Sequence, residues 1–487
     1  MTRTFQFADP ADAIIGAAPP ALPTYGVDRI AAYLTEGYWA ETGRGPRSFD
    51  VVPGEALTVD LSALSGAARG VAGTALDAWT AVSGIGFEAP APGAGRADIT
   101  FAEDGAGAHA STLVSEGRIY FAAVNVAEDW SDYGGYYLQT YIHEIGHALG
   151  LGHAGDYNAT ADHATDAHYA NDSWQMSVMS YFDQDATPAD DGTRLYLDTP
   201  QRADIAAIHD LYGAPTWLRA EDTTYGDGDS TGDPGMDLAP GRARTIHDGG
   251  GRDTIDLSAR GADQVLDLAP GRFSDLDGAR GNLGLTAGTV IEVARTGPGR
   301  DTIHGNGAAN HLSGGAGDDI LRGRGGDDRL AGGPGSDRID GGAGTDRAAF
   351  DGTVAEWDAI WDAQGAAGAL GLTRAATGET DRLTSVEALS FGTQELAVAA
   401  LLSELSARFG PVAPGSDAVH RAPVAALVDD DDPLPLLAAD AADVAGAANG
   451  WGAASGGDDP DLWTDTDDDS GAGLAAWPDP TGLHDIA

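Results

Sequence analysis

The 487-residue sequence contains no cysteine, so no disulfide bond stabilises its fold. Such a chain depends on its hydrophobic core, on bound metals, or on both. It also contains no lysine: all 27 basic residues are arginine, against 76 acidic residues and a formal net charge of −49. This excess of acid argues against nucleic acid as a partner and favours the binding of hard cations through carboxylates. Adaptation to saline surroundings would produce the same excess.

The sequence also lacks long hydrophobic runs. Nothing approaches the roughly 20 apolar residues that cross a bilayer, so we predict no membrane span. Residues 1–10 lack the basic start and apolar stretch of a cleavable signal peptide. The chain is long enough for two or more domains, each with its own core.

One motif of the H-E-x-x-H-x-x-G-x-x-H type begins at His143. Tyr137 to Leu149 is expected to be a helix, because it has no proline and its apolar residues recur at helical spacing. His143 and His147 are four residues apart and therefore project from one face. Gly150 lets the backbone leave the helix sharply, so that His153 can become a third ligand. Three protein ligands leave one zinc position for water, which is typical of a catalytic site.

Glu144 follows the first ligand, His143, and faces the open side of the predicted metal without binding it. A carboxylate placed there is suited to take a proton from a metal-bound water. The bare H-E-x-x-H pattern also occurs by chance in helices. The added glycine and third histidine make the extended motif far more restrictive.

A second motif, Ser177 to Tyr181, resembles the Met-turn of the metzincin peptidases, for which the extended histidine motif is the other signature. The segment from Thr140 to Gly213 resembles the catalytic core of the serralysins. Beyond the two motifs, the resemblance is carried by Gly155 to Asn158, Tyr169 to Ser173, Asp204 to Ile208 and Leu211 to Gly213.

The resemblance to serralysins implies roles for two Met-turn residues. Met179 would lie beneath the zinc ligands as a hydrophobic floor. Tyr181 would be a mobile zinc ligand that also stabilises the transition state. Ala154 stands where the family usually has proline after the third histidine, which removes no ligand.

The segments before the histidine motif predict an α+β zincin domain. Strands are expected at Leu57–Leu61, Ala97–Phe101 and Gly117–Ala123, with an amphipathic helix at Gly66–Val82. The resemblance implies that the edge strand of this sheet pairs with an extended substrate. The spacing does not indicate which strand is the edge.

Glycine and aspartate dominate from about residue 215 to Phe350, where six nine-residue units run without a gap. The units start at Thr296, Gly305, Gly314, Gly323, Gly332 and Gly341. They match the calcium-binding repeats-in-toxin (RTX) nonapeptide, which forms an all-β parallel β-roll. Because successive units alternate between two sides, Asp301, Asp319 and Asp337 should line one edge. Asp328 and Asp346 should line the other edge, with Asn310 as a weaker contributor.

The junction before the repeats, Arg219 to Gly226, resembles a serralysin calcium site in which Asp222 would be a ligand. The usual glycine before that aspartate is Glu221 here. A solvated acidic turn is the alternative.

The predicted organisation is an N-terminal leader or prosegment (1–26), a metzincin protease domain (27–214), the RTX roll (215–350), a strand-rich cap (351–400) and an acidic tail (401–487). Residues 411–487 contain 16 aspartates, one arginine and no glutamate, which predicts disorder. The resemblance implies type I secretion with an uncleaved C-terminal signal, and Asp485 to Ala487 is compatible with it.

We therefore predict a secreted, monomeric zinc endopeptidase that hydrolyses extracellular proteins. It would use one catalytic zinc ion and several structural calcium ions. The alternative is a non-enzymatic calcium-binding adhesion protein with a vestigial protease domain. The complete histidine triad and Glu144 argue against that alternative. The cleavage preference does not follow from the sequence.

Overall fold

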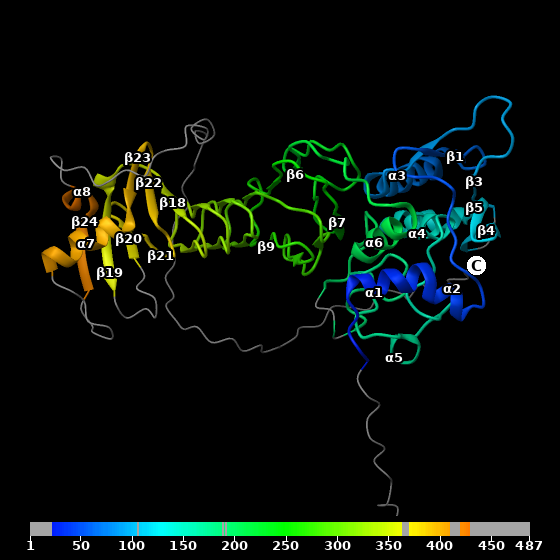
Figure 1. The fold of residues 1–487 in the computed structure, drawn as a ribbon, viewed down its shortest axis with the longest axis horizontal. Coiled ribbons are helices and arrows are strands. Elements are labelled where there is room, and N and C mark those ends of the chain that lie inside the picture. The colour runs from blue at the N-terminus through cyan, green and yellow to red at the C-terminus, as the bar shows by residue number, and fades with distance from the viewer. Residues whose placement is uncertain are drawn as a thin grey trace, which may run out of the picture.

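The computed structural model describes residues 22–428, except 105–106, 188, 190–191, 363–369 and 410–418. The predicted leader up to residue 21 and the tail beyond residue 428 lie outside the described residues. The others form a mixed α/β lobe at one end and an elongated roll of short strands at the other (Figure 1). None of the helices described is long and apolar enough to cross a membrane.

The α/β lobe is built on a five-stranded sheet with the order β2-β1-β3-β5-β4. Its strands are β1 (Ala56–Asp60), β2 (Gly86–Glu88), β3 (Ile99–Ala102), β4 (Ala108–Ser115) and β5 (Arg118–Val126). The three strands predicted from the sequence correspond to β1, β3 and β5. Only β4 runs antiparallel to its neighbour, and it forms one edge of the sheet. The sequence did not predict β4, because six of its eight residues are polar or alanine.

Two long helices pack together beneath this sheet. Helix α3 (Gly66–Ser83) begins at the N-cap Ser65, whose hydroxyl accepts from the backbone N–H of Ala68, and ends at Gly84 with φ of 67°. Helix α4 (Gly135–Ala148) carries the histidine motif. The indole N–H of Trp79 on α3 donates to the Ile142 carbonyl on α4 at 2.9 Å, so the two helices are joined inside the core.

Shorter elements complete the lobe. They are α1 (Val27–Ala32), a π-helix η1 (Tyr33–Gly37), α2 (Tyr38–Glu41), a 3-10 helix η2 (Glu128–Tyr133), α5 (His163–Asp166) and α6 (Arg202–Tyr212). The α1–α2 segment covers the chain after α4: Trp39 Nε1 donates to the Gly150 carbonyl at 2.9 Å. Gly150 has φ of 109°, and an added Cβ would meet the Arg47 carbonyl at 2.2 Å. This close approach requires glycine, as the sequence predicted.

The roll consists of two eight-stranded sheets, ordered β23-β22-β18-β16-β14-β12-β8-β6 and β24-β19-β20-β21-β17-β15-β13-β9. Successive repeats supply β13 (Thr302–His304), β14 (His311–Ser313), β15 (Ile320–Arg322), β16 (Arg329–Ala331), β17 (Arg338–Asp340) and β18 (Arg347–Phe350). These strands alternate between the two sheets and pair in parallel with the unit 18 residues away. The predicted β-roll fold is therefore confirmed. Its core is one buried aliphatic residue per unit, such as Leu321 and Leu330.

A strand-rich cap follows the repeats. It comprises η3 (Val354–Glu356), β19 (Trp357–Asp362), β20 (Leu370–Arg374), β21 (Thr380–Thr384), β22 (Ala388–Phe391), β23 (Gln394–Ala397) and α7 (Val398–Phe409). Strand β24 (Val419–Pro423) and α8 (Val424–Leu427) then pack on β19. The sequence predicted disorder from residue 411, which is wrong for this stretch. Its Ala422, Val424 and Leu427 are buried, so it has enough apolar surface to fold onto the cap.

The two bodies meet at an insertion between the lobe and the repeats. Strands β6 (Thr224–Gly226), β8 (Thr254–Asp256), β9 (Val265–Asp267) and β12 (Val293–Arg295) begin the roll. The strands β7 (Arg244–Ile246), β10 (Phe273–Ser274) and β11 (Leu283–Leu285) form a separate three-stranded sheet, the insertion sheet, in the order β10-β11-β7. It lies next to α6 in Figure 1.

Candidate metal centre and active site

The three predicted histidine ligands converge in a buried position at the end of α4. Nε2 of His147 lies 3.1 Å from Nε2 of His143 and 3.0 Å from Nε2 of His153. They form a group of metal-ligating residue types with ligand atoms within 4.8 Å of one another. A tetrahedral zinc ion with bonds of about 2.0–2.1 Å separates its nitrogen ligands by about 3.4 Å. The spacing of the three nitrogens is close to that value.

Hydrogen bonds on the opposite ring atoms decide the tautomers of two of these histidines. His143 Nδ1 lies 2.8 Å from the Val178 carbonyl, and His147 Nδ1 lies 2.8 Å from the Leu151 carbonyl. Because a carbonyl only accepts, both Nδ1 atoms carry the proton, and both Nε2 atoms present lone pairs. Lone pairs facing each other at 3.1 Å repel unless a cation lies between them. The donor set therefore fits a divalent metal ion.

The Met-turn lies directly beneath this helix. An ideal Cβ at Gly146 would come within 2.7 Å of Met179 Sδ and 3.1 Å of Trp79, so only glycine lets the methionine approach. Met179 itself is fully buried. Its carbonyl accepts from the N–H of Ala154, the residue after the third histidine, at 3.3 Å. The methionine thus contacts both the helix and the loop that carry the histidines.

A buried carboxylate fixes the Met-turn. Asp204 on α6 accepts from the Ser177 hydroxyl at 2.6 Å and from the Val178 N–H at 2.7 Å. The carbonyl of the same residue, Val178, accepts the hydrogen bond from His143 Nδ1. Burial raises the pKa of Asp204 to about 6 despite these donors. The sequence placed Asp204 in the serralysin-like segment but gave it no role.

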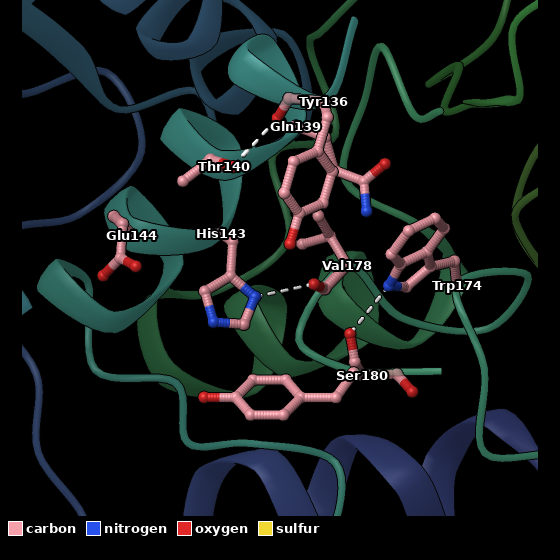
Figure 2. A pocket seen from close by; sticks show the side chains of 9 residues that line it. Tyr136, Gln139, Thr140, His143, Glu144, Trp174, Val178 and Ser180 are labelled. Carbon is pink, nitrogen blue, oxygen red and sulfur yellow. Dashed lines mark hydrogen bonds between the residues drawn. The ribbon is translucent and has the colours of Figure 1, made fainter. Parts of the chain in front are cut away.

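A cavity opens beside His143. It is lined by Tyr136, Gln139, Thr140, His143, Glu144, Trp174, Val178, Ser180 and Tyr181. Figure 2 shows the Glu144 carboxylate and the His143 ring leaving the same helix, with Val178 and Trp174 across the cavity. Both predicted catalytic residues, Glu144 and Tyr181, therefore face the space next to the histidines. The Tyr181 ring lies 4.6 Å from the His153 ring and 6.0 Å from the His143 ring, centroid to centroid.

Aromatic packing holds the third histidine. Tyr38 meets the His153 ring edge-on at 5.2 Å, and Tyr157 lies 5.8 Å away on another side. The Tyr157 hydroxyl donates to buried Asp172, which also accepts from the Ser180 hydroxyl at 2.7 Å. Burial, and then the charge of Asp172, raises the pKa of Tyr157 well above its ordinary value, so its hydroxyl stays a donor. Tyr38 carried no sequence signal for this position.

The repeat aspartates form two rows along the roll. In one row, the N–H of Asp301 donates to Asp319 and the N–H of Asp319 donates to Asp337, at 2.8 and 2.9 Å. In the other row, Asn310 donates to Asp328 at 2.7 Å and Asp328 donates to Asp346 at 2.9 Å. The structure places the predicted residues on the two predicted edges.

Each row continues into the cap. The N–H of Asp337 donates to Asp381, and the N–H of Asp346 donates to Glu387, both at 2.8 Å. Asp381 and Glu387 were not predicted from the sequence, because neither belongs to a nine-residue unit. The parallel pairing of β17 with β21 and of β18 with β22 is what brings them into the rows.

One oxygen of each repeat aspartate has a backbone donor, and the other is buried without a partner among the described residues. These partnerless atoms are Oδ2 of Asp301, Asp319, Asp328, Asp337 and Asp346. Burial raises the pKa of Asp319 to about 7, and burial followed by the Asp381 charge raises that of Asp337 to about 9. Burial makes the charged form of these carboxylates unfavourable. A hard cation such as calcium, which prefers oxygen ligands, would compensate for that cost.

The junction differs from the prediction for Asp222. Asp222 is exposed, and its carboxylate accepts from the Arg252 N–H at 2.9 Å. Asp253 and Asp248 are buried acids of this region, and Asp253 is the one that follows the pattern of the repeat aspartates. It accepts from the Thr223 N–H at 2.8 Å, and its Oδ2 has no partner among the described residues. Burial raises its pKa to about 7.

Comparison with known proteins identifies the family. Residues 214–400 match the family model described as Peptidase M10 serralysin C terminal. Metallopeptidase AprA of Pseudomonas marginalis is 35% identical over 324 residues, which cover 59% of this chain and 67% of that protein. The chain belongs to the serralysin family. Serralysin of Photorhabdus luminescens is 40% identical over 188 residues (37% of this chain, 38% of that protein), and Serralysin C of Dickeya chrysanthemi is 41% identical over 173 residues (34% and 36%).

Family membership confirms the resemblance predicted from the sequence. It also confirms the fold class, a metzincin-type lobe followed by a parallel β-roll. As a serralysin the chain is a metallopeptidase, with zinc and calcium as its metals. The predicted class of a secreted zinc endopeptidase is confirmed at the level of the family, and no comparison favours the non-enzymatic alternative.

Proposed function

We propose that His143, His147 and His153 hold one zinc ion and that this serralysin cleaves peptide bonds in the cavity beside it. The convergence of three Nε2 atoms, two of them with fixed tautomers, is the observation that carries this proposal. When bound, zinc lowers the pKa of a coordinated water toward about 7 and polarises the carbonyl of the substrate.

The protein supplies the proton transfers. Glu144 lies on the helix between the two ligands His143 and His147, and its carboxylate lines the cavity. We assign it the role of the base that takes a proton from the attacking water and passes it to the leaving amine. Tyr181 lines the same cavity, and its hydroxyl is assigned to donate to the oxyanion that develops on the substrate carbonyl. Met179 serves as the floor on which the ligands rest.

The substrate is assigned to the edge strand β4. Among the residues that the structure describes, this strand pairs with β5 on one side only, so its other side can hydrogen-bond with an extended peptide. Helix α4, which carries Glu144, lies beneath the same part of the sheet (Figure 1). Protein and peptide chains that lie along β4 would thus pass the cavity.

Calcium is assigned to the two carboxylate rows of the roll and to the junction. Its ligands would be the repeat aspartates with Asp381 and Glu387 at the cap end and Asp253 at the lobe end. Asp222 is retained only as an exposed neighbour of that junction. The role of calcium is structural, because it would neutralise rows of buried acids that otherwise repel one another. Export through a type I apparatus, the monomeric state and the division at residues 214, 350 and 400 remain predictions.

Metal analysis combined with casein digestion tests the proposal. The purified, calcium-loaded protein should contain one zinc ion per chain and should cleave casein. A zinc-selective chelator should abolish cleavage, and added zinc should restore it. Calcium-dependent attachment to cells by a protein that lacks stoichiometric zinc and chelator-sensitive cleavage would instead support the adhesion alternative.

A further inference from the structure

The insertion sheet contacts the lobe at the segment that leads into α6. The Thr245 hydroxyl on β7 donates to Gln201 Oε1 at 3.1 Å. The backbone N–H of Thr245 donates to the Thr199 hydroxyl at 2.9 Å, and Gln201 Nε2 donates to the Thr199 carbonyl at 2.8 Å. Thr245 is 1% exposed and Gln201 is 2% exposed. A residue of the insertion sheet therefore fixes the orientation of a side-chain amide in the lobe.

Gln201 is in turn bonded to the carboxylate that holds the Met-turn. The backbone N–H of Gln201 donates to Asp204 Oδ2 at 2.7 Å, and the Gln201 side chain accepts from the Asp204 N–H. The two residues thus form a capping box at the start of α6. This reciprocal pairing means that Asp204 cannot shift without moving Gln201.

Asp204 continues the connection to the active site. Its Oδ2 also accepts from the Val178 N–H, and the Val178 carbonyl accepts from His143 Nδ1. From Thr245 to His143 every bond is between buried groups, where hydrogen bonds are less screened than in water. Partners that orient a metal ligand from outside its coordination shell typically alter metal affinity or activity 10-fold to 100-fold when removed.

We infer that Thr245 of the insertion sheet is a positioning residue for His143, acting through Gln201, Asp204 and the Val178 peptide. The inference rests on the proposed role of His143 as a zinc ligand. It gives the insertion sheet a part in catalysis, because this sheet supplies the first donor of a hydrogen-bonded path that ends on a metal ligand. Thr245 is not among the residues that line the cavity, so its effect on the His143 ring passes through the path.

The decisive comparison is between two substitutions of Thr245, one that removes the hydroxyl and one that keeps it. Thr245→Val removes the donor to Gln201 at nearly constant volume, and Thr245→Ser retains it. Thr193→Val removes a hydroxyl that accepts from the Arg280 N–H across the same interface but leads to no ligand, at a more exposed position. Thr373→Val removes a buried hydroxyl paired with Thr380 in the cap, and serves as the control for burial.

Three quantities are measured on the full-length, calcium-saturated protein: zinc affinity by competition with a chelator, kcat and KM on a peptide substrate, and the thermal midpoint. Thr245→Val should weaken zinc binding and lower kcat about threefold to tenfold, the effect of one lost buried hydrogen bond, with KM nearly unchanged. Thr245→Ser should keep the zinc affinity and the kcat of the wild type. The two control variants should keep wild-type zinc affinity and kcat, whatever their thermal midpoints.

The outcomes separate the inference from the proposed function. If the wild-type protein binds no zinc, the proposed function fails. If the wild type binds zinc and Thr245→Val differs from wild type no more than the controls do, the positioning role of Thr245 is overturned. Should Thr245→Val not fold, Thr245→Ala removes the same hydroxyl without placing a new methyl group against Gln201, and is judged by the same comparison.

Discussion

Gly146 and Met179 lie so close that a single added carbon atom would not fit between them. A Cβ on Gly146 would approach Met179 Sδ to 2.7 Å. Gly146→Ala should therefore destabilise the folded protein by about 1–3 kcal/mol, the usual effect of overpacking a core. Thermal unfolding with zinc and calcium present measures this. Gly70→Ala in α3 is the control, because nothing beyond the adjacent residues and backbone of its own helix lies within 4 Å of the added Cβ; it should be neutral or stabilising. Equal midpoints for both variants would contradict the packing argument.

Glu144→Gln should lower kcat by a factor of about 10² to 10⁴ and leave the zinc content unchanged. The amide keeps the size of the side chain but cannot take a proton, and general base catalysis typically contributes a factor of this order. Single-turnover digestion and metal analysis on one preparation measure both effects. A variant that cleaves casein at the wild-type rate would show that another group is the base.

Tyr181→Phe should lower kcat about 10²-fold, with KM changed little. A hydroxyl that donates only to the developing oxyanion stabilises the transition state and not the bound substrate. Tyr133→Phe, at an exposed position on η2, is the matched control and should behave as wild type. A raised KM at constant kcat in Tyr181→Phe would assign the hydroxyl to substrate binding.

The calcium-free roll should lose stability as the pH rises from about 4 to about 9. Burial raises the pKa of Asp301 to about 6, that of Asp319 to about 7 and that of Asp337 to about 9, all above the ordinary value of 3.8. The folded state then binds more protons than the unfolded chain across this interval, so its free energy of unfolding falls with pH. In excess chelator, the thermal midpoint followed by near-UV circular dichroism should be lower at pH 8 than at pH 5. Saturating calcium should reduce or reverse the difference.

Asp253→Asn should weaken calcium binding at the junction, whereas Asp222→Asn should have little effect. Asp253 is buried and one of its oxygens has no partner in the described part of the chain, whereas Asp222 is exposed. Calcium titration by calorimetry compares the two variants directly. A larger loss in Asp222→Asn would restore the ligand assignment that the sequence suggested.

Local spacing was sufficient to predict the elements whose chemistry lies in one short segment. The spacing of the histidine motif predicted the helix that carries it. The nine-residue spacing of the repeats predicted which aspartates share an edge of the roll. Residues that reach the site from distant parts of the chain could not be predicted in this way. Asp204 and Tyr38 act on the histidines only because α6 and α2 pack against the loop that follows α4.

Two other differences have the same origin. The acid rows continue through Asp381 and Glu387, which are placed by strand pairing and not by any repeat. The segment Val419–Leu427 looks unstructured in a window dominated by aspartate. Its few apolar residues are buried because β24 pairs with β19, and this pairing cannot be seen in the local sequence.

The alternation of units between two sheets limits how such a chain can change its length. Loss of one nine-residue unit would reverse the side on which every later strand emerges, so that β21 would join the sheet that now holds β22 and each terminal acid would meet the wrong row. Loss or gain of two units, 18 residues, preserves both registers. Versions of this roll that gain or lose an even number of units should therefore fold, and versions that gain or lose an odd number should not.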